Sequence, residues 1–217
     1  MVKILIIAPH PDDEIIGCGG LIAKLSKKHK VSVCYVTCPY TPEWSQEYID
    51  EKIKQIYGAK EILNIDKLYF LDFPAAKLDT IPMKDLNSKI LEIIKIVNPD
   101  ILFIPHIGDL HVDHRLVFES CIVASRPINN IKSILSYEVL SETEWGYENH
   151  FVPNSYIDIT DTIDIKLNAM KEISLETKQP PHPRSLEVIE ALAKKRGSEV
   201  GFKYAESFKV IREKIDL

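Results

Sequence analysis

One imidazole and three carboxylates follow a short apolar segment near the start of this chain. Residues 2–8 are apolar apart from Lys3, and the run His10-Pro11-Asp12-Asp13-Glu14 comes almost directly after them. Ionisable groups crowded at the end of a strand repel one another, and a divalent cation that binds imidazole nitrogen and carboxylate oxygen relieves that repulsion. The run therefore indicates a metal site. We interpret Glu14 separately, as a carboxylate that complements the dipole of the helix that follows.

A second polar cluster follows another apolar segment, residues 101–105. It begins at His106 and ends in the run His111-Val112-Asp113-His114. We interpret His106 as a loop histidine with a local partner, and Asp109 as a carboxylate close to the metal. Ligands in α/β sheets lie beyond the carboxyl ends of the strands, so the two clusters are predicted to form two halves of one site.

Apolar segments alternate with helical patterns through the first part of the chain. Short β-branched or aromatic runs, typical of buried parallel strands, lie at residues 2–8, 31–37, 68–71 and 101–105. Apolar residues recur at helical spacing in residues 17–29, 44–63, 84–97 and 113–124. This alternation predicts βαβ units, and hence an α/β fold with a Rossmann-like layered sheet that is mostly parallel.

The pattern changes from about residue 131. Strands are predicted at residues 134–140, 156–159 and 208–211, and helices at residues 163–175 and 186–195. Between the two helices, Pro180, Pro181 and Pro183 exclude helical structure and indicate a loop. Because no repeat or long linker divides the chain, we expect one domain over residues 1–217. It comprises a Rossmann-like core at 1–126 and a C-terminal α+β extension at 127–217 packed on that core.

Composition excludes several classes of protein. The chain has 217 residues, 45% of them hydrophobic, which is enough for one large core. A formal net charge of −5 and scattered lysines and arginines argue against nucleic-acid binding. The apolar segment at residues 2–8 is too short for a signal sequence or a membrane span, so we expect a cytoplasmic enzyme. Homo-oligomerisation stays open.

The cysteines and the first glycines have structural interpretations. Cys18, Cys34, Cys38 and Cys121 form no C-x-x-C pair, and we expect buried thiols. The run Gly17-Cys18-Gly19-Gly20 lacks the spacing of a dinucleotide fingerprint, and the acidic residues before it would repel a pyrophosphate. These small residues predict close packing of a helix against the sheet.

Three motifs in order resemble those of the LmbE-like de-N-acetylases, the family of the GlcNAc-phosphatidylinositol deacetylases. They are the run from Ala8 to Glu14, the run from His111 to His114, and the late segment from Arg196-Gly197 to Tyr204-Ala205-Glu206-Ser207-Phe208. The similarity spans nearly the whole chain. It implies a metal-dependent hydrolase that removes the N-acetyl group from an N-acetylglucosamine-like amino sugar or its conjugate.

The resemblance also implies the metal ligands. His10, Asp13 and His114 would bind one Zn²⁺, and two histidines with one carboxylate are a recurring ligand set of catalytic zinc. Fe²⁺, Co²⁺ and Mn²⁺ tolerate the same ligands.

Catalytic roles follow from the same motifs. Asp12 resembles the general base of the family, and His111 resembles a second catalytic histidine that stabilises the oxyanion as an imidazolium. We expect the Asp113 carboxylate to orient His111 and raise its pKa. A metal-dependent phosphoesterase is the alternative enzyme, although it would usually need a second metal. A non-catalytic module that binds sugar or stores metal would have no need of Asp12 or of an oriented His111.

Substrate contacts are the least specified part of the site. Asp109, His182 and Arg184 are the candidates, the last two because a histidine and an arginine on a loop can bind a phosphate or a sugar hydroxyl and so suit an anionic glycoconjugate. Two departures from the family pattern concern the sugar. Lys52 or Lys54 stands where many relatives have an arginine, and Pro74-Ala75-Ala76 lacks the aspartate that often follows the proline.

Overall fold

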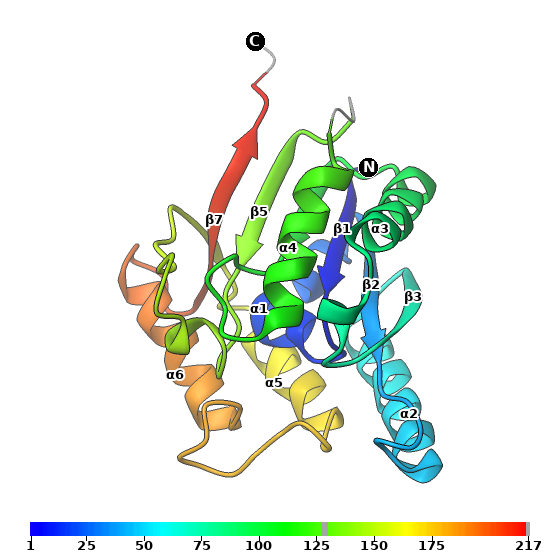
Figure 1. The fold of residues 1–217 in the computed structure, drawn as a ribbon. Coiled ribbons are helices and arrows are strands. Elements are labelled where there is room, and N and C mark those ends of the chain that lie inside the picture. The colour runs from blue at the N-terminus through cyan, green and yellow to red at the C-terminus, as the bar shows by residue number, and fades with distance from the viewer. Residues whose placement is uncertain (127–129, 216–217) are drawn as a thin grey trace.

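Seven strands form one mixed sheet in the computed structural model, which describes residues 1–126 and 130–215 (Figure 1). The strands are β1 Lys3–Ala8, β2 Lys30–Cys38, β3 Lys67–Pro74, β4 Ile101–Ile104, β5 Ser133–Tyr137, β6 Ser155–Asp158 and β7 Ala205–Glu213. The α-helices are α1 Asp13–Leu25, α2 Gln46–Leu63, α3 Met83–Val97, α4 Val112–Ala124, α5 Ile163–Glu172 and α6 Leu186–Ser198. Two 3₁₀ helices, η1 Leu78–Thr80 and η2 Thr143–Trp145, complete the elements of the described chain.

The sheet confirms the predicted fold class. Its order is β3-β2-β1-β4-β5-β7-β6. The first five strands in this order pair in parallel, and β7 runs antiparallel to both β5 and β6. The first five positions match the first five of the Rossmann strand order 3-2-1-4-5-6. The later strands continue this sheet, since β5 pairs directly with β4. Residues 127–129, where the extension was predicted to begin, lie outside the described residues.

Two apolar layers, one on each face of the sheet, explain why residues 4–8 of β1 are all hydrophobic and do not alternate with polar residues. Side chains on a strand point to opposite faces in turn, so Ile4 and Ile6 pack into one core cluster with residues of α1, α2 and α5. Leu5 and Ile7 pack into the other cluster, with residues of α3 and α4. A strand that is covered on both faces carries no polar side chain in its buried part.

The glycines of α1 allow the helix to approach its neighbours closely, as predicted. A Cβ atom at Gly17 would lie 2.3 Å from the Tyr137 ring, and one at Gly20 would lie 2.8 Å from Ile159. Both glycines therefore have a packing function. Of the four free cysteines, Cys18, Cys34 and Cys121 are buried as expected, while Cys38 is half-buried.

Some boundaries differ from those predicted. Helix α1 begins at Asp13 instead of residue 17, because the carboxylate of Asp13 is favoured in the first turn of a helix. Strand β5 ends at Tyr137, where its pairing with Phe208 of β7 ends, so residues 138–140 form the loop that follows.

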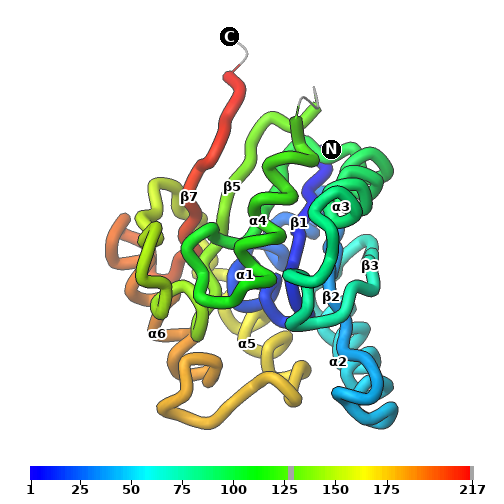
Figure 2. Tube along the Cα trace, in the orientation of Figure 1, coloured from blue at the N-terminus to red at the C-terminus, as the bar shows by residue number. Residues whose placement is uncertain are grey.

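Both polar clusters lie at one edge of the sheet. β1 and β4 are adjacent parallel strands, and the chain leaves them toward opposite sides of the sheet order, which is the topological switch point where α/β proteins bind ligands. The segments after β1 and before α4 meet at this edge (Figure 2). The segment that joins α5 to α6 passes below it (Figure 1). No helix in the described ranges is long and apolar enough to cross a membrane.

Candidate metal centre and active site

The loop between β1 and α1 forms the first half of the site. The backbone N–H of His10 donates to Asp13 Oδ2 at 2.8 Å, and the N–H of Asp13 donates back to the carbonyl of His10 at 3.3 Å. Asp12 is the N-cap of α1. This tight turn brings all three side chains to the end of β1.

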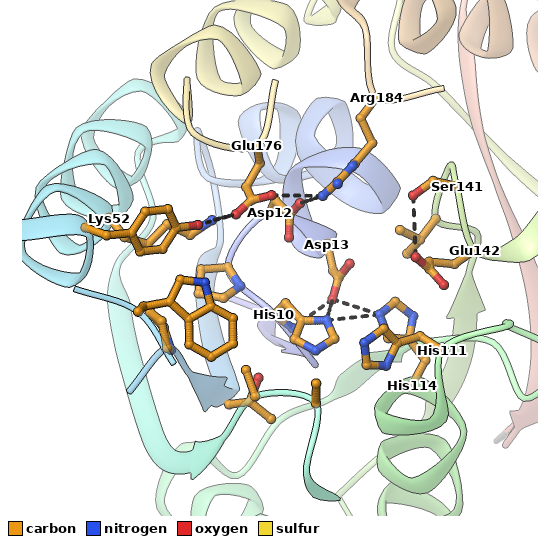
Figure 3. A pocket seen from close by; sticks show the side chains of 18 residues that line it. His10, Asp12, Asp13, Lys52, His111, His114, Ser141, Glu142, Glu176 and Arg184 are labelled. Carbon is orange, nitrogen blue, oxygen red and sulfur yellow. Dashed lines mark hydrogen bonds and ion pairs between the residues drawn. The ribbon is translucent and has the colours of Figure 1, made fainter. Parts of the chain in front are cut away.

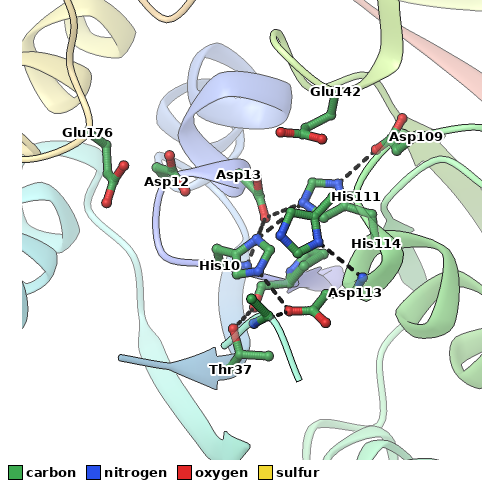
Figure 4. A network of polar contacts seen from close by, with 12 residues as sticks. His10, Asp12, Asp13, Thr37, Asp109, His111, Asp113, His114, Glu142 and Glu176 are labelled. Carbon is green, nitrogen blue, oxygen red and sulfur yellow. Dashed lines mark hydrogen bonds and ion pairs between the residues drawn. The ribbon is translucent and has the colours of Figure 1, made fainter. Parts of the chain in front are cut away.

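The start of α4 forms the second half. His111 is the N-cap residue, and its Nδ1 accepts a hydrogen bond from the backbone N–H of Asp113 at 3.1 Å. Asp113 and His114 follow in the first turn and are buried. The cap therefore fixes the ring of His111 and turns His114 toward His10 (Figure 4).

Three donor atoms form a nearly equilateral triangle. His114 Nε2 lies 3.2 Å from His10 Nδ1 and 3.3 Å from Asp13 Oδ2, and the distance from His10 Nδ1 to Asp13 Oδ2 is 3.4 Å. Ligand atoms at two corners of a zinc tetrahedron with bonds of about 2.0–2.1 Å are about 3.3–3.4 Å apart. The residues thus fit one small divalent ion and leave one corner open.

His10 also belongs to a second group, together with His111 and Asp113. The Asp113 carboxylate, however, already accepts hydrogen bonds from the backbone N–H groups of Ala76 at 2.8 Å and Leu78 at 3.1 Å. The triangle that includes Asp13 is the better metal site, and because both groups need His10 they do not provide two separate sites.

Each histidine of the triangle has a carboxylate on its other ring nitrogen. Asp113 Oδ2 lies 3.0 Å from His10 Nε2, and Asp109 Oδ2 lies 2.8 Å from His114 Nδ1. Such outer carboxylates orient metal-binding imidazoles and increase their basicity. The expectation that the Asp113 carboxylate orients His111 is therefore wrong, because that carboxylate contacts His10. Asp109 is buried behind His114, away from the cavity, which excludes the direct contact with substrate that we expected.

The charges of the triangle are strongly coupled. Burial opposes a charge on His10, but hydrogen bonds to Asp113 and Asp13 outweigh it and raise the pKa of His10 to about 9. Burial likewise opposes a charge on His114, yet Asp13 and Asp109 raise its pKa well above the usual value. The carboxylate of Asp13 is buried too, and the two histidines hold its pKa below the usual value.

Asp12 points into the cavity beside the triangle. Burial, followed by the charge of Asp13, raises the pKa of Asp12 above the usual value for an aspartate. A raised pKa suits a carboxylate that must take up a proton and release it again. Arg184 Nη1 lies 3.2 Å from Asp12 Oδ2 and holds the carboxylate in place.

The surroundings of His111 favour its neutral form. Burial, together with the neighbouring His10 and His114, lowers the pKa of His111 to about 4. Its Nδ1 accepts a hydrogen bond, so the proton of the neutral ring resides on Nε2. This environment favours the neutral ring over the imidazolium that we expected from the sequence, and Nε2–H is then the donor that faces away from the Asp113 backbone.

The cavity measures about 260 Å³ and exposes the triangle, Asp12 and His111 on one side (Figure 3). Its other walls come from segments without a recognised motif. They contribute Trp44, Tyr48, Lys52, Ala75, Ala76, Glu142, Glu176 and Arg184. Of these, only Lys52, the two alanines and Arg184 were singled out from the sequence. The half-buried carboxylate of Glu142 follows β5, a place where sequence pattern carries no signal.

Two further predictions change in the structure. His182 does not line the cavity; its Nδ1 instead accepts a hydrogen bond from the backbone N–H of Arg184 at 3.0 Å and so shapes the loop that carries the arginine. Glu14 is fully buried, and burial raises its pKa to about 8 despite a hydrogen bond from the Tyr35 hydroxyl. A protonated glutamic acid does not complement a helix dipole.

The fold and the site together define an α/β protein with a histidine and aspartate centre at the switch point of its sheet. The sequence profile of the PIG-L family, GlcNAc-PI de-N-acetylase, matches residues 5–125, which is more than half of the chain. The chain belongs to the PIG-L family of de-N-acetylases. The resemblance noted in the three motifs is thereby confirmed.

One relative and one solved structure are similar to this chain over nearly its whole length. Diacetylchitobiose deacetylase of Thermococcus kodakarensis is 26% identical over 226 residues, which cover 96% of this chain and 83% of that protein. A conserved protein from Thermus thermophilus superposes with a TM-score of 0.81 at 22% identity, covering 100% of this chain and 98% of that one.

The same fold also occurs in an enzyme with a different activity. A 4-carboxy-2-hydroxymuconate hydratase from Pseudomonas putida has a TM-score of 0.77 at 17% identity, with coverage of 100% and 99%. The fold alone does not decide the reaction, which depends on the residues of the site.

Proposed function

We propose that this protein is a metal-dependent hydrolase that removes the acetyl group from an N-acetylglucosamine-like amino sugar or its conjugate. One observation carries the proposal: the triangle of His10, Asp13 and His114 has the spacing of zinc ligands, with Asp12 and His111 beside it in one cavity. Zn²⁺ is the metal that this spacing favours. The family and the chitobiose-deacetylating relative support the substrate class.

The residues divide the work as follows. A divalent ion held by the triangle would polarise the amide carbonyl and lower the pKa of the attacking water. Asp12 accepts a proton from that water and returns it to the nitrogen as the C–N bond breaks. His111 donates its Nε2–H to the carbonyl oxygen as negative charge develops there.

The cavity wall suits a sugar ring. Trp44 and Tyr48 supply aromatic surface that can pack against the apolar face of a pyranose. Arg184 is held beside Asp12 and contributes to this wall. We place the enzyme in a reducing compartment such as the cytoplasm, a setting that the four free cysteines support.

A phosphoesterase remains the alternative enzyme, and the ligand groups favour it less. Two-metal phosphoryl chemistry needs two separate sites about 3.5–4 Å apart. In the described parts of the chain, both candidate groups depend on His10. A non-catalytic module would not require the raised pKa of Asp12 next to a ligand.

Acetate release from a panel of N-acetylated sugars tests the proposal. The zinc-loaded protein should release acetate, Asp12→Asn should retain metal and lose most turnover, and Asp13→Ala should lose both. Asp161→Asn, an exposed substitution that also removes one carboxylate, is the matched control. No acetate from any sugar, or turnover of Asp12→Asn within a few fold of wild type, would contradict the proposal.

A further inference from the structure

Four charged side chains form an unbroken line along one wall of the cavity. Lys52 Nζ lies 2.8 Å from Glu176 Oε1, and Arg184 Nη1 lies 2.9 Å from Glu176 Oε2. The same Arg184 nitrogen lies 3.2 Å from Asp12 Oδ2. The order is therefore cation, carboxylate, cation, carboxylate, and Glu176 lies between the two cations (Figure 3).

Glu176 is held from three directions. Its Oε1 also accepts a hydrogen bond from the Tyr48 hydroxyl at 3.1 Å. The side chain of Lys52 is 3% exposed and that of Glu176 is 18% exposed, so their ion pair is largely withdrawn from water. Removing one partner of a buried pair is costly, because the other charge is left without compensation. The pair is thus a fixed part of the wall.

In this arrangement both cations of the cavity wall are already paired with a carboxylate. Lys52 and Arg184 are the lysine and arginine among its described lining residues, and both are paired with Glu176. The lining carboxylates are Asp12, Asp13, Glu142 and Glu176. With all of these groups ionised, a bound divalent ion brings the charge to zero. An anionic substituent would then meet no surplus positive charge, and its pairing with Lys52 or Arg184 would require an existing ion pair to break.

We propose that Glu176 is a specificity-determining residue that restricts this cavity to uncharged N-acetylated sugars, because it pairs with both cations that would otherwise attract an anionic substituent. The inference rests on the proposed function and names the substrate class of the same site. It replaces the expectation from the sequence that Arg184 binds an anionic glycoconjugate.

The test compares isosteric glycosides of N-acetylglucosamine that differ in one charge. One pair carries a carboxymethyl or a carbamoylmethyl aglycone, and a second pair has a carboxylate or a carboxamide at C6. We expect the zinc-loaded wild type to prefer the uncharged member by at least about tenfold in kcat/KM. Glu176→Gln keeps the shape of the side chain and should shift this ratio toward the anion by about tenfold in at least one pair, since one charge is removed from a partly buried wall.

Control variants separate charge from shape. Glu176→Asp retains the carboxylate and should keep the wild-type preference. Lys52→Met removes a cation and should strengthen the preference for the uncharged sugar. Glu47→Gln removes a carboxylate from the exposed first turn of the same helix α2, and should leave the ratio unchanged.

Calorimetry measures the affinities for the corresponding deacetylated glycosides. Within each pair, the ratio of affinities for the carboxylate and the carboxamide compound tests the effect of the charge without any turnover. Absence of acetate release therefore contradicts the proposed function, while the affinity ratios still decide the role of Glu176. A wild type that binds the anion as well as the uncharged sugar overturns the inference. So does a Glu176→Gln protein whose ratios stay within twofold of wild type in both pairs.

Discussion

Binding of one divalent metal ion should release about two protons at pH 7. In the metal-free protein, Asp13 Oδ2 lies 3.4 Å from His10 Nδ1 and 3.3 Å from His114 Nε2. The pKa of His10 is raised to about 9. The pKa of His114 is also well above its usual value. Since a metal binds the neutral imidazole, both rings must lose a proton on binding.

The cost of this deprotonation can be worked out for His10. With a pKa of about 9, the ring is almost fully protonated at pH 7, and two pK units correspond to about 2.7 kcal/mol. The apparent metal affinity should therefore rise by up to about a hundredfold per pH unit between pH 6 and 8, because two protons are lost. The stability of the metal-free fold has the opposite pH dependence to the metal affinity: it decreases as the pH rises. The stabilisation from charged His10 is complete below about pH 6.5 and is lost as the pH rises through about 9.

Calorimetry of zinc binding in buffers with different ionisation enthalpies measures the released protons directly. A count near two at pH 7, with an affinity that increases steeply toward pH 8, is the expected result. A count near zero, or an affinity independent of pH over this interval, would show that the histidines are neutral before the metal binds. The carboxylates Asp109 and Asp113 would then not raise their basicity as argued.

Three substitutions test other parts of the structure. His111→Ala should lower kcat by about 10²–10³ and leave the alkaline limb of the pH profile in place, because the pKa of His111 is about 4; a lost alkaline limb would contradict its neutral state. Asp109→Asn should weaken zinc binding by about 10–100-fold in competition with a chelator, whereas unchanged affinity would argue against orientation of His114 by the carboxylate. Lys166→Met should destabilise the fold by about 3–5 kcal/mol in urea, since buried Glu206 loses its partner, while the exposed control Lys171→Met should cost little; equal midpoints for the two variants would refute the argument.

The metal triangle was predictable because its ligands lie in two short motifs, each of which follows a recognisable apolar strand. His10 and Asp13 follow one apolar strand, and His114 follows another strand and a short loop. Parallel strands bring their carboxyl ends to the same edge, so the order of the elements was enough to bring the two clusters together. The Rossmann-like order of the sheet follows from the same alternation of strands and helices.

Partner choice inside the site was not predictable in this way. Asp113 lies between His111 and His114 in sequence, yet its carboxylate contacts His10, which is 103 positions away. A short helical turn directs the carboxylate away from both sequence neighbours, and the backbone N–H of Asp113 takes over the orientation of His111. Several ring nitrogens lie close to this carboxylate, and tertiary geometry decides which one it faces. The spacing of residues in the sequence does not encode that choice.

The wall that contains Glu176 was missed for a related reason. Glu176 lies just beyond α5, among residues that lack helical or strand periodicity, and its partner Lys52 lies on α2. A lysine on an amphipathic helix normally indicates a solvated face, but here α5 packs against α2 and buries it. Only the packing of the two helices makes these residues part of the cavity.

The third motif of the family acquires a physical function from the same kind of packing. Glu206 of β7 does not line the cavity; its carboxylate accepts hydrogen bonds from the backbone N–H groups of Gly20 and Leu21 in α1, each at 2.8 Å. Lys166 of α5 bonds to Glu206 at 2.7 Å and to the carbonyl of Ile16 at 2.7 Å. This buried pair fixes the helix whose first residue is Asp13. A motif near the end of the chain thus holds the metal-binding turn near its beginning, so the metal site depends on the integrity of α5 and β7 as well as on its own ligands.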